Sequence, residues 1–182
     1  PSCLIFYLGV KGKVDNLKHH TLFFEHELSN HIEDIYTNKK WPEKPLFYVC
    51  CPSKTDNTVA PMEDENLFLL LPVANNLEDT EEIRETYLED MLNRIEKNTG
   101  ENNVRERIIY KRSYCVNDFK KDYNAYGGNA YGLANTLKQT AIFKPAIRNK
   151  KIKNLYYTGQ LTVPGPGVPP SIISGKIVAN EI

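Results

Sequence analysis

The segment that most constrains the fold of this chain lies near its C-terminal end. Residues 154–159 are largely apolar and aromatic and finish in Gly159, a pattern typical of a strand with a tight exit. The Pro/Gly-rich residues 163–170 follow, and residues 171–179 then have the composition of a helix whose first turn tolerates proline. A strand end, a rigid loop and a helix N-terminus together direct backbone N–H groups and about half a positive charge at one point. Such a point suits an anion or an electron-rich heterocycle.

The same segment, taken alone, also fits a simpler interpretation. Pro166-Gly167-Val168-Pro169 satisfies the P-x-x-P pattern of proline-rich ligands, and a Pro/Gly loop is equally compatible with a rigid surface turn. A second hypothesis is therefore a binding module without catalysis, which docks a partner through this loop.

The rest of the chain alternates between strand-like and helix-like patterns, which predicts an α+β fold. The clearest helix covers residues 80–98, where apolar side chains recur on one face. Asp79 with Glu82 suits an N-cap pair, and Gly100 suits a C-terminal stop. The predicted strands are residues 3–8, 20–24, 46–51, 67–71 and 108–114, and the shorter predicted helices are residues 28–36 and 117–123.

Aromatic side chains are frequent in the predicted strands. We expect most of them in the core, although some could line an apolar tunnel for a long ligand. The set consists of Phe23, Phe24, Phe47, Tyr48 and Phe68.

Charge and hydropathy exclude two classes of protein. The sequence carries 23 basic and 23 acidic side chains and a formal charge of zero, so electrostatic attraction to nucleic acid is not expected. The longest apolar stretch, residues 67–73, is far shorter than the roughly 20 residues of a membrane-spanning helix.

Cysteine and histidine side chains show no ligand pattern in the sequence. The four cysteines Cys3, Cys50, Cys51 and Cys115 have no C-x-x-C spacing, which predicts reduced intracellular thiols and neither structural zinc nor a secreted disulfide framework. None of the four histidines stands at ligand spacing from a cysteine or a carboxylate. The sequence therefore predicts no metal site.

Several motifs of the chain resemble those of the phytoene desaturase family, which comprises carotenoid desaturases. Residues 154–176 contain N-L-Y-x-x-G, P-G-x-G-V-P and S-G-K, close to the family's C-terminal pattern N-L-Y-x-x-G-A-G-T-H-P-G-x-G-I-P and its G-S-A-K helix. The resemblance extends upstream to H-H-T at residues 19–21, T-D-x-T-x-A-P at 55–61, N-A-Y-x-G-x-A at 124–130 and Q-x-A-x-F-x-P-x-x-R at 139–148. It therefore covers nearly the whole chain.

The resemblance implies an α+β or α/β fold with two parts. A Rossmann-type FAD-binding domain would be split in the sequence and completed by the C-terminal strand and helix, beside a mixed-sheet substrate domain. A change of composition near residue 125 suggests the boundary. Residues 1–125 are then part of the substrate-binding domain, and residues 126–182 are the segment that completes the FAD-binding domain.

The same resemblance, carried over position by position, gives a set of residues for FAD. It implies that Gly159 and Gln160 lie near the ribityl and phosphate groups. The residues implied near the flavin ring are Gly167, Val168, Pro169 and Ile172.

The activity implied by the resemblance is FAD-dependent desaturation of a carotenoid. Such a reaction moves a hydride from an allylic carbon to flavin N5 and removes a proton from the neighbouring carbon. Phytoene, dehydrosqualene and a hydroxylated carotenoid, as for a 3,4-desaturase, all fit as substrates. Gln160 and Leu161 stand where the family usually has Ala-Gly, and Val163 stands where it often has His, so the substrate stays open. A polyene isomerase or saturase of the same flavoprotein family is an alternative.

Two residues are candidates for contact with the substrate, and no residue is predicted as the catalytic base. Asp56 lies in the polar loop of residues 53–61, where a carboxylate can either meet a ligand or cap its own turn. Tyr126 opens the glycine-rich, aromatic residues 126–133, which suit close backbone approach or a loop against a ligand.

The sequence also predicts that further parts of the protein complete the site. It opens at Pro1 in a strand-like segment with no signal peptide, and it contains no G-x-G-x-x-G fingerprint for the pyrophosphate. We therefore expect a C-terminal fragment whose partners are a carotenoid and the N-terminal part of the same enzyme. The expected location is cytoplasmic, peripheral at the membrane that holds the lipophilic substrate.

Overall fold

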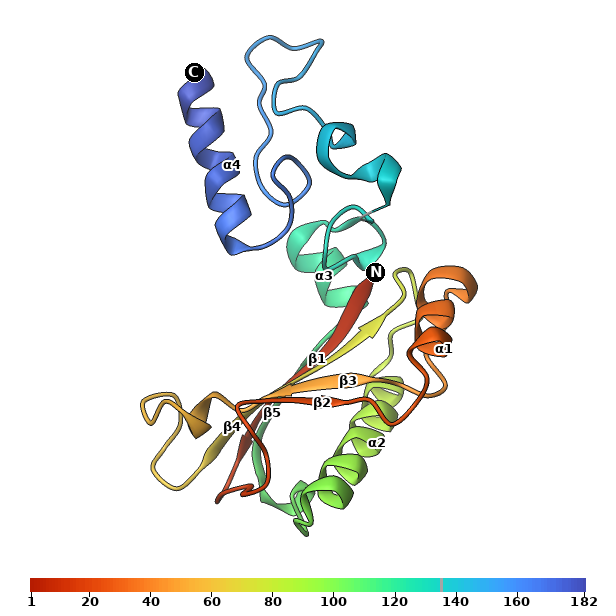
Figure 1. The fold of residues 1–182 in the computed structure, drawn as a ribbon, viewed down its shortest axis with the longest axis vertical. Helices are drawn as coiled ribbons and strands as arrows, with labels where there is room; N and C mark the ends of the chain where they lie inside the picture. The colour runs from red at the N-terminus through yellow and green to blue at the C-terminus, as the bar shows by residue number, and fades with distance from the viewer. Residues whose placement is uncertain (135) are drawn as a thin grey trace. The chain divides into compact units, whose positions relative to one another are not determined.

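The computed structural model describes residues 1–134 and 136–182 (Figure 1). They form two compact units, Pro1–Ala130 and Tyr131–Ile182, which we call unit 1 and unit 2 and describe separately. Among the helices of the described residues, none combines the length and the apolar character needed to cross a membrane.

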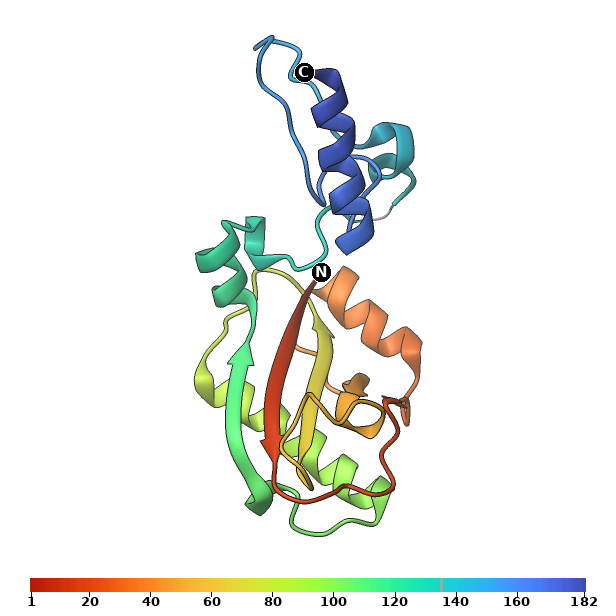
Figure 2. The same cartoon turned by 90° about the vertical axis from the view of Figure 1, so that its left-hand side faces the viewer.

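Unit 1 is built on a sheet with the strand order β2-β3-β4-β1-β5 (Figures 1 and 2). The strands are β1 (Ser2–Val10), β2 (His20–Phe23), β3 (Phe47–Cys50), β4 (Glu65–Val73) and β5 (Ile108–Tyr114). All described pairs are antiparallel, where the sequence implied a mixed sheet. The predicted combination of strands and helices is confirmed.

Alternation of side chains along β1 and β4 places the core on one face of the sheet. Phe6 and Leu69 are fully buried on this face. The helix α2 (Glu81–Thr99) covers it (Figure 2) and contributes Leu88 and Met91 to the same cluster. Burial of each such side chain stabilises the fold by about 1.5–3 kcal/mol. We call this the inner face and the opposite one the outer face.

The predicted core aromatic residues divide between the two faces. Phe23 and Phe47 stack in the core, with ring centroids 4.4 Å apart. Tyr48 and Phe68 lie on the outer face, and Phe24, which follows β2, is exposed. The prediction is therefore right for two of the five, because neighbouring residues of a strand point to opposite faces.

The ends of α2 show one correction. Thr80 is the N-cap, and its Oγ1 accepts the Ile83 N–H at 3.3 Å. The predicted N-cap, Asp79, is wrong by one residue because its carboxylate accepts from the guanidinium of Arg84 at 2.6 and 2.7 Å instead. At the other end Gly100 adopts φ of 73°, as predicted for a C-terminal stop.

Two shorter helices flank the sheet of unit 1. The predicted helix 28–36 is α1 (Leu28–Glu33), continued by a π-helical turn at Asp34–Asn38. The predicted helix 117–123 is α3 (Val116–Tyr123). Both predictions are confirmed in position, with the usual shifts at the ends.

Unit 2 contains α4 (Val168–Glu181), which begins three residues before the predicted start, with Gly167 as its N-cap and proline in its first turn. The predicted strand at residues 154–159 is wrong. The described residues of this segment make only an isolated antiparallel bridge between Arg148 and Tyr156. A strand forms by pairing with a neighbouring strand, and none lies beside this segment within the described part of unit 2.

Candidate functional site

The outer face of the unit 1 sheet carries aromatic side chains from four strands. Residues opposite one another in antiparallel strands share a face, so the register defines rows across the sheet. One row is Leu22, Tyr48, Leu70, Ile5 and Tyr114, and the next is His20, Cys50, Phe68, Tyr7 and Arg112. Ring contacts join the two rows, since the Phe68 centroid lies 5.5 Å from that of Tyr7 and 6.4 Å from that of Tyr48.

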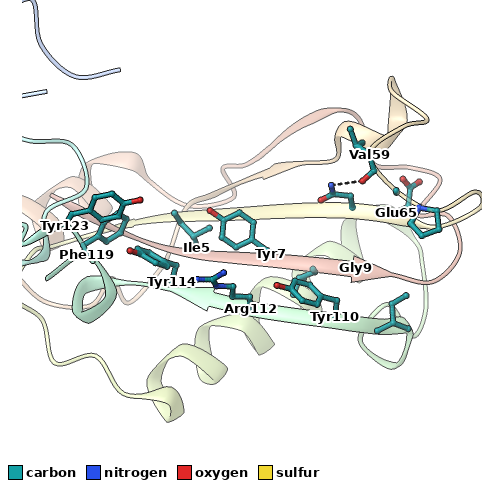
Figure 3. Close-up of a pocket in the computed structure, with 15 residues that line it drawn as sticks. Ile5, Tyr7, Gly9, Val59, Glu65, Tyr110, Arg112, Tyr114, Phe119 and Tyr123 are labelled. Carbon is teal, nitrogen blue, oxygen red and sulfur yellow. Dashed lines mark hydrogen bonds between the residues drawn. The ribbon is translucent and has the colours of Figure 1, made fainter. Parts of the chain in front are cut away.

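These rows border a groove of about 740 Å³ along β1 and β5 (Figure 3). Tyr110 and Tyr114 line it, Phe119 and Tyr123 of α3 close one end, and residues 59–61 close the other. Phe119 packs edge-to-face on Tyr114, with centroids 4.8 Å apart. The seven residues of β5 extend over roughly 23 Å. The aromatic rings and the length of the groove suit an elongated molecule that has apolar surface.

Polar groups line the groove beside its aromatic rings. Arg112 is exposed, and no carboxylate pairs with it among the described residues. The Tyr114 hydroxyl donates to Asp122 at 2.9 Å. Burial, followed by this carboxylate, raises the pKa of Tyr114 far above its ordinary value, so the phenol stays neutral. The groove therefore offers one cation and tyrosine hydroxyl groups to a ligand.

Glu65 borders the same groove, but its charge is already neutralised. Lys54 Nζ lies 2.6 Å from Oε1, and the Ser53 hydroxyl and the Cys51 thiol donate to Oε2. Burial by itself would raise the pKa of Glu65, but these donors, Lys54 foremost, lower it below its ordinary value. A charged carboxylate held by three donors is poorly suited to take a proton from a ligand.

Tyr126, a predicted substrate contact, lies outside the groove. It opens a 3₁₀ turn after α3 and is 85% exposed. The glycine-rich sequence around it serves backbone packing: a Cβ at Gly128 would stand 2.3 Å from the Val116 carbonyl oxygen. The Ser2 hydroxyl donates to the Gly128 carbonyl at 2.5 Å. Close backbone approach, one of the two explanations offered by the sequence, therefore accounts for Gly128.

Asp56, the other predicted contact, caps its own loop. Its Oδ1 accepts the Thr58 N–H at 2.8 Å and the Thr58 hydroxyl at 2.6 Å. These bonds from Thr58 lower the pKa of the exposed Asp56 carboxyl. The turn-capping alternative has a structural basis, and contact with a substrate stays a prediction.

In unit 2, the loop of residues 159–167 is anchored on α4. The Gly159 N–H donates to Ser174 Oγ at 2.7 Å. The backbone angle φ is 101° at Gly159, 138° at Gly165 and 113° at Gly167. Residues other than glycine rarely adopt these values. A Cβ at Gly159 would meet nothing within 4 Å, so the space beside it is open. A ligand could therefore approach the backbone at Gly159 closely.

Lys144 adds a buried positive charge beside this loop. It is 8% exposed, and its Nζ has no hydrogen-bond partner within residues 1–134 and 136–182. A Cβ built on Gly165 would stand 3.4 Å from this Nζ. A buried ammonium without a partner is unfavourable, so an acceptor atom of a ligand would stabilise it. Val168 and Ile172 offer exposed apolar surface on the first turns of α4.

A cation, an open backbone loop and an apolar helix face together fit the flat, acceptor-rich ring of a flavin. The individual roles implied for Gly159, Gln160, Gly167, Val168, Pro169 and Ile172 stay predictions.

Comparison with known proteins shows that the chain is similar along its whole length to a carotenoid 3,4-desaturase and to a 4,4'-diapophytoene desaturase. No family model matches it. The predicted resemblance to carotenoid desaturases is confirmed.

Among individual relatives, the chain is 45% identical over 182 residues to the carotenoid 3,4-desaturase of Haloarcula japonica. It is 30% identical over 183 residues to the 4,4'-diaponeurosporene oxygenase of Staphylococcus aureus, and 29% identical over 191 residues to the 4,4'-diapophytoene desaturase of Staphylococcus haemolyticus. Each match covers the whole chain but only 37% of the relative. The chain therefore spans well under half the length of these relatives.

Sequence reasoning missed two features of the candidate site. Lys144 lies inside the Q-x-A-x-F-x-P motif at residues 139–145, but its burial depends on contacts that periodicity does not report. The aromatic outer face was not predicted, because most of the strand aromatic residues were expected in the core. No sign of two faces is visible in the sequence here, because the unbroken apolar run of residues 67–71 hides the alternation of buried and half-buried side chains along β4.

Proposed function

We propose that the chain is the C-terminal part of an FAD-dependent carotenoid desaturase, which introduces double bonds into a lipophilic polyene. The observation that carries this proposal is the 45% identity, maintained over all 182 residues, to a carotenoid 3,4-desaturase. Two features support it: the aromatic groove of unit 1, and the loop of residues 159–167 with Lys144 beside it in unit 2. A desaturase needs a place for a long apolar substrate and a place for a flavin.

On the cofactor side, unit 2 completes the FAD site. Gly159 and Gln160 would hold the ribityl and phosphate groups, and Lys144 would offer a positive charge to the flavin ring. The residues assigned to the ring are Gly167, Val168, Pro169 and Ile172. Bound FAD supplies the hydride acceptor.

On the substrate side, the polyene lies in the groove of the outer face. The tyrosine rings bind it by stacking and dispersion, and the apolar walls keep water away from the reacting carbons. Arg112 and the Tyr110 hydroxyl can bind a polar end group. This favours a hydroxylated carotenoid over phytoene or dehydrosqualene. Asp56 and Tyr126 are secondary candidates for substrate contact, and we assign no residue of the chain as the base.

The remaining parts of the machinery lie outside this chain. The N-terminal part of the same enzyme supplies the pyrophosphate fingerprint, which closes the Rossmann-type FAD-binding domain. The enzyme acts in the cytoplasm, peripherally attached to the membrane from which it takes its carotenoid. Nucleic acid is not a partner, given the balanced charge.

Product analysis with the intact protein and a series of polyenes tests the function. We expect new double bonds only in the presence of an electron acceptor, formed fastest with a hydroxylated carotenoid. Isomerised polyene in the absence of any acceptor would show an isomerase instead, and a loss of double bonds would show a saturase. A folded protein that converts no polyene would favour the binding module with its proline-rich loop.

A further inference from the structure

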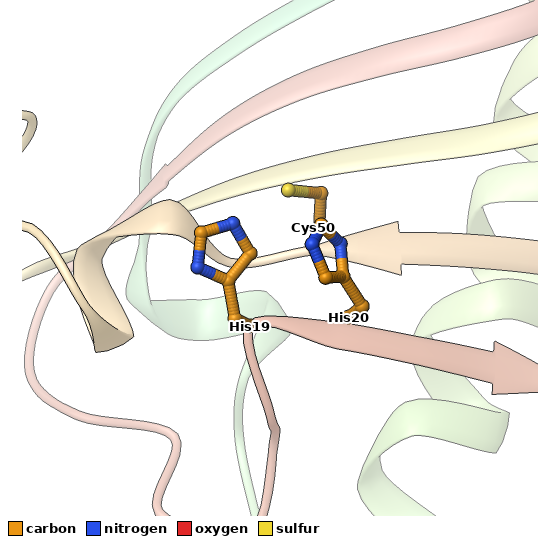
Figure 4. A group of neighbouring side chains, drawn as sticks. All are labelled: His19, His20 and Cys50. Atoms are coloured by element: carbon orange, nitrogen blue, oxygen red, sulfur yellow. The ribbon is translucent and has the colours of Figure 1, made fainter.

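The start of β2 and the end of β3 bring two imidazoles and a thiol together (Figure 4). His20 pairs with Cys50 across the two strands, and the His19 carbonyl accepts the Cys51 N–H at 2.8 Å, which continues the ladder by one residue. One potential ligand atom from each of His19, His20 and Cys50 lies within 4.8 Å of the other two. The sequence showed no such set because the thiol and the imidazoles come from different strands.

Hydroxyl groups orient both imidazoles. Nδ1 of His19 lies 2.6 Å from Thr55 Oγ1, and Nδ1 of His20 lies 2.6 Å from Tyr48 Oη. When Nδ1–H donates to such an oxygen, Nε2 carries the lone pair that a metal ion needs, and outer bonds of this kind hold metal-binding histidines in place.

The position of Tyr48 also relates the imidazole of His20 to the thiol of Cys50. Tyr48 and Cys50 lie two residues apart on β3, so their side chains share the outer face of the sheet. The Tyr48 hydroxyl, 2.6 Å from His20 Nδ1, therefore stands on the same face of the sheet as the thiol of Cys50. The thiolate is the form of cysteine that binds metals.

We propose that His19, His20 and Cys50 bind one zinc ion, with water as the fourth ligand. Two imidazoles and a thiolate are ligands that zinc prefers in tetrahedral sites, at about 2.0–2.1 Å from nitrogen and about 2.3 Å from sulfur. They discriminate against magnesium and calcium, which prefer oxygen. None of the three side chains is buried, so an ion can reach them from solution. Binding releases the thiol proton of Cys50 to solvent.

The ion would clamp the edge of the sheet. β2 is an edge strand that pairs with β3 through only four residues, His20–Phe23. The zinc ion, bound to both imidazoles and to the sulfur of Cys50, would cross-link these two strands. The clamp lies at the end of the row that continues with Phe68 and Tyr7, and so it also fixes the border of the outer face. This inference does not depend on the proposed desaturase function.

Metal titration of the intact, chelator-treated protein tests the site, with Co²⁺ as a coloured probe for Zn²⁺. We expect one additional equivalent of Co²⁺ to bind with a thiolate-to-cobalt absorption band, and Zn²⁺ to displace it. Cys50→Ser should abolish the band, and His20→Gln should weaken binding at least about tenfold. His26→Gln is the matched control, because His26 is an exposed imidazole outside the cluster. Equal binding by Cys50→Ser and His26→Gln would overturn the proposal.

Alkylation of the unmodified sequence gives a test that needs no variant. Cys50 is half-buried whereas Cys51 and Cys115 are fully buried, so its peptide should react first with a thiol reagent. Zn²⁺ is expected to slow alkylation of Cys50 at least about tenfold, while Mg²⁺ leaves the rate unchanged. No protection by Zn²⁺ would show that the cluster does not bind the ion.

Discussion

Unit 1 and unit 2 differ in what they bury. Unit 1 encloses large apolar side chains such as Phe6 and Phe47 between its sheet and α2. In the described part of unit 2, the buried side chains are Lys144, Thr162 and Ser174, all of them polar. Little buried apolar surface means little free energy of folding from the unit itself. The difference indicates that unit 1 supplies its own stability, whereas unit 2 depends on what covers it, which we propose to be FAD and the rest of the FAD-binding domain.

The largest effect is expected from a core substitution in unit 1. Phe6→Ala should lower the free energy of unfolding of the chain by about 3–5 kcal/mol, because it leaves a cavity between the sheet and α2. Ile172→Ala in unit 2 should change it by less than about 0.5 kcal/mol, because this side chain is exposed. Chemical denaturation followed by circular dichroism measures both. Similar losses for the two variants would break the comparison between the units.

Removal of the positive charge of Lys144 in unit 2 should change the binding and the reduction potential of the flavin. Lys144→Met is expected to weaken flavin retention by the intact protein about tenfold or more and to lower the flavin reduction potential, because the reduced ring loses a positive neighbour. Lys138→Met, at an exposed lysine of the same unit, is the control. Equilibrium dialysis and spectroelectrochemistry measure the two quantities. Equal flavin retention and equal reduction potentials in the two variants would show that Lys144 does not contact the flavin.

Acid should weaken unit 1 through His31. Its Nδ1 accepts the Leu46 N–H at 2.8 Å, and its Nε2 lies 2.9 Å from the Pro72 carbonyl oxygen. Burial lowers the pKa of His31 below the ordinary 6.5 and outweighs the opposing effects of Pro72 and Asp34. The unfolded chain therefore binds this proton at higher pH than the folded one.

The stability contributed by neutral His31 is complete above about pH 6.5 and is lost as the pH falls through the folded pKa. His31→Gln should show a flatter dependence of unfolding free energy on pH between about 7.5 and 5. Denaturation curves at each pH measure it. A variant with the same slope as the original sequence would contradict the assignment.

The smallest effect on stability is expected at the groove. Tyr110→Ala should change the free energy of unfolding by no more than about 0.5 kcal/mol, yet raise the KM for the polyene a few-fold, because one aromatic contact is lost. Tyr36→Ala is the matched control, since Tyr36 is 56% exposed and Tyr110 is 55% exposed, but Tyr36 lies outside the groove. Steady-state kinetics of both variants sharpens the distinction between the two faces. Equal KM values for Tyr110→Ala and Tyr36→Ala would show that the groove does not bind the polyene.

Local patterns predicted the elements that are stabilised locally. The helix α2 follows from its apolar stripe and from Gly100, which can adopt the left-handed turn that ends it. The prediction of a strand at residues 154–159 was wrong because a strand forms only when a second strand, often distant in sequence, pairs with it. The N-cap is Thr80 and not the predicted Asp79, because the carboxylate of Asp79 forms an ion pair with Arg84.

Functional features were predicted where a motif carries them and missed where three-dimensional proximity creates them. The glycine turns at Gly159 and Gly167 were visible in the sequence as part of a motif. The burial of Lys144 and the approach of Cys50 to the histidines arise from packing and strand register. Spacing along the chain contains no information on such contacts.

The visible absorption spectrum of the intact protein after desalting tests the central claim most directly. Our account predicts flavin absorption that survives desalting in the original sequence and in Lys138→Met, and that is strongly reduced in Lys144→Met. A well-folded protein with no flavin absorption, even after incubation with FAD, would contradict the assignment of unit 2 to the cofactor site.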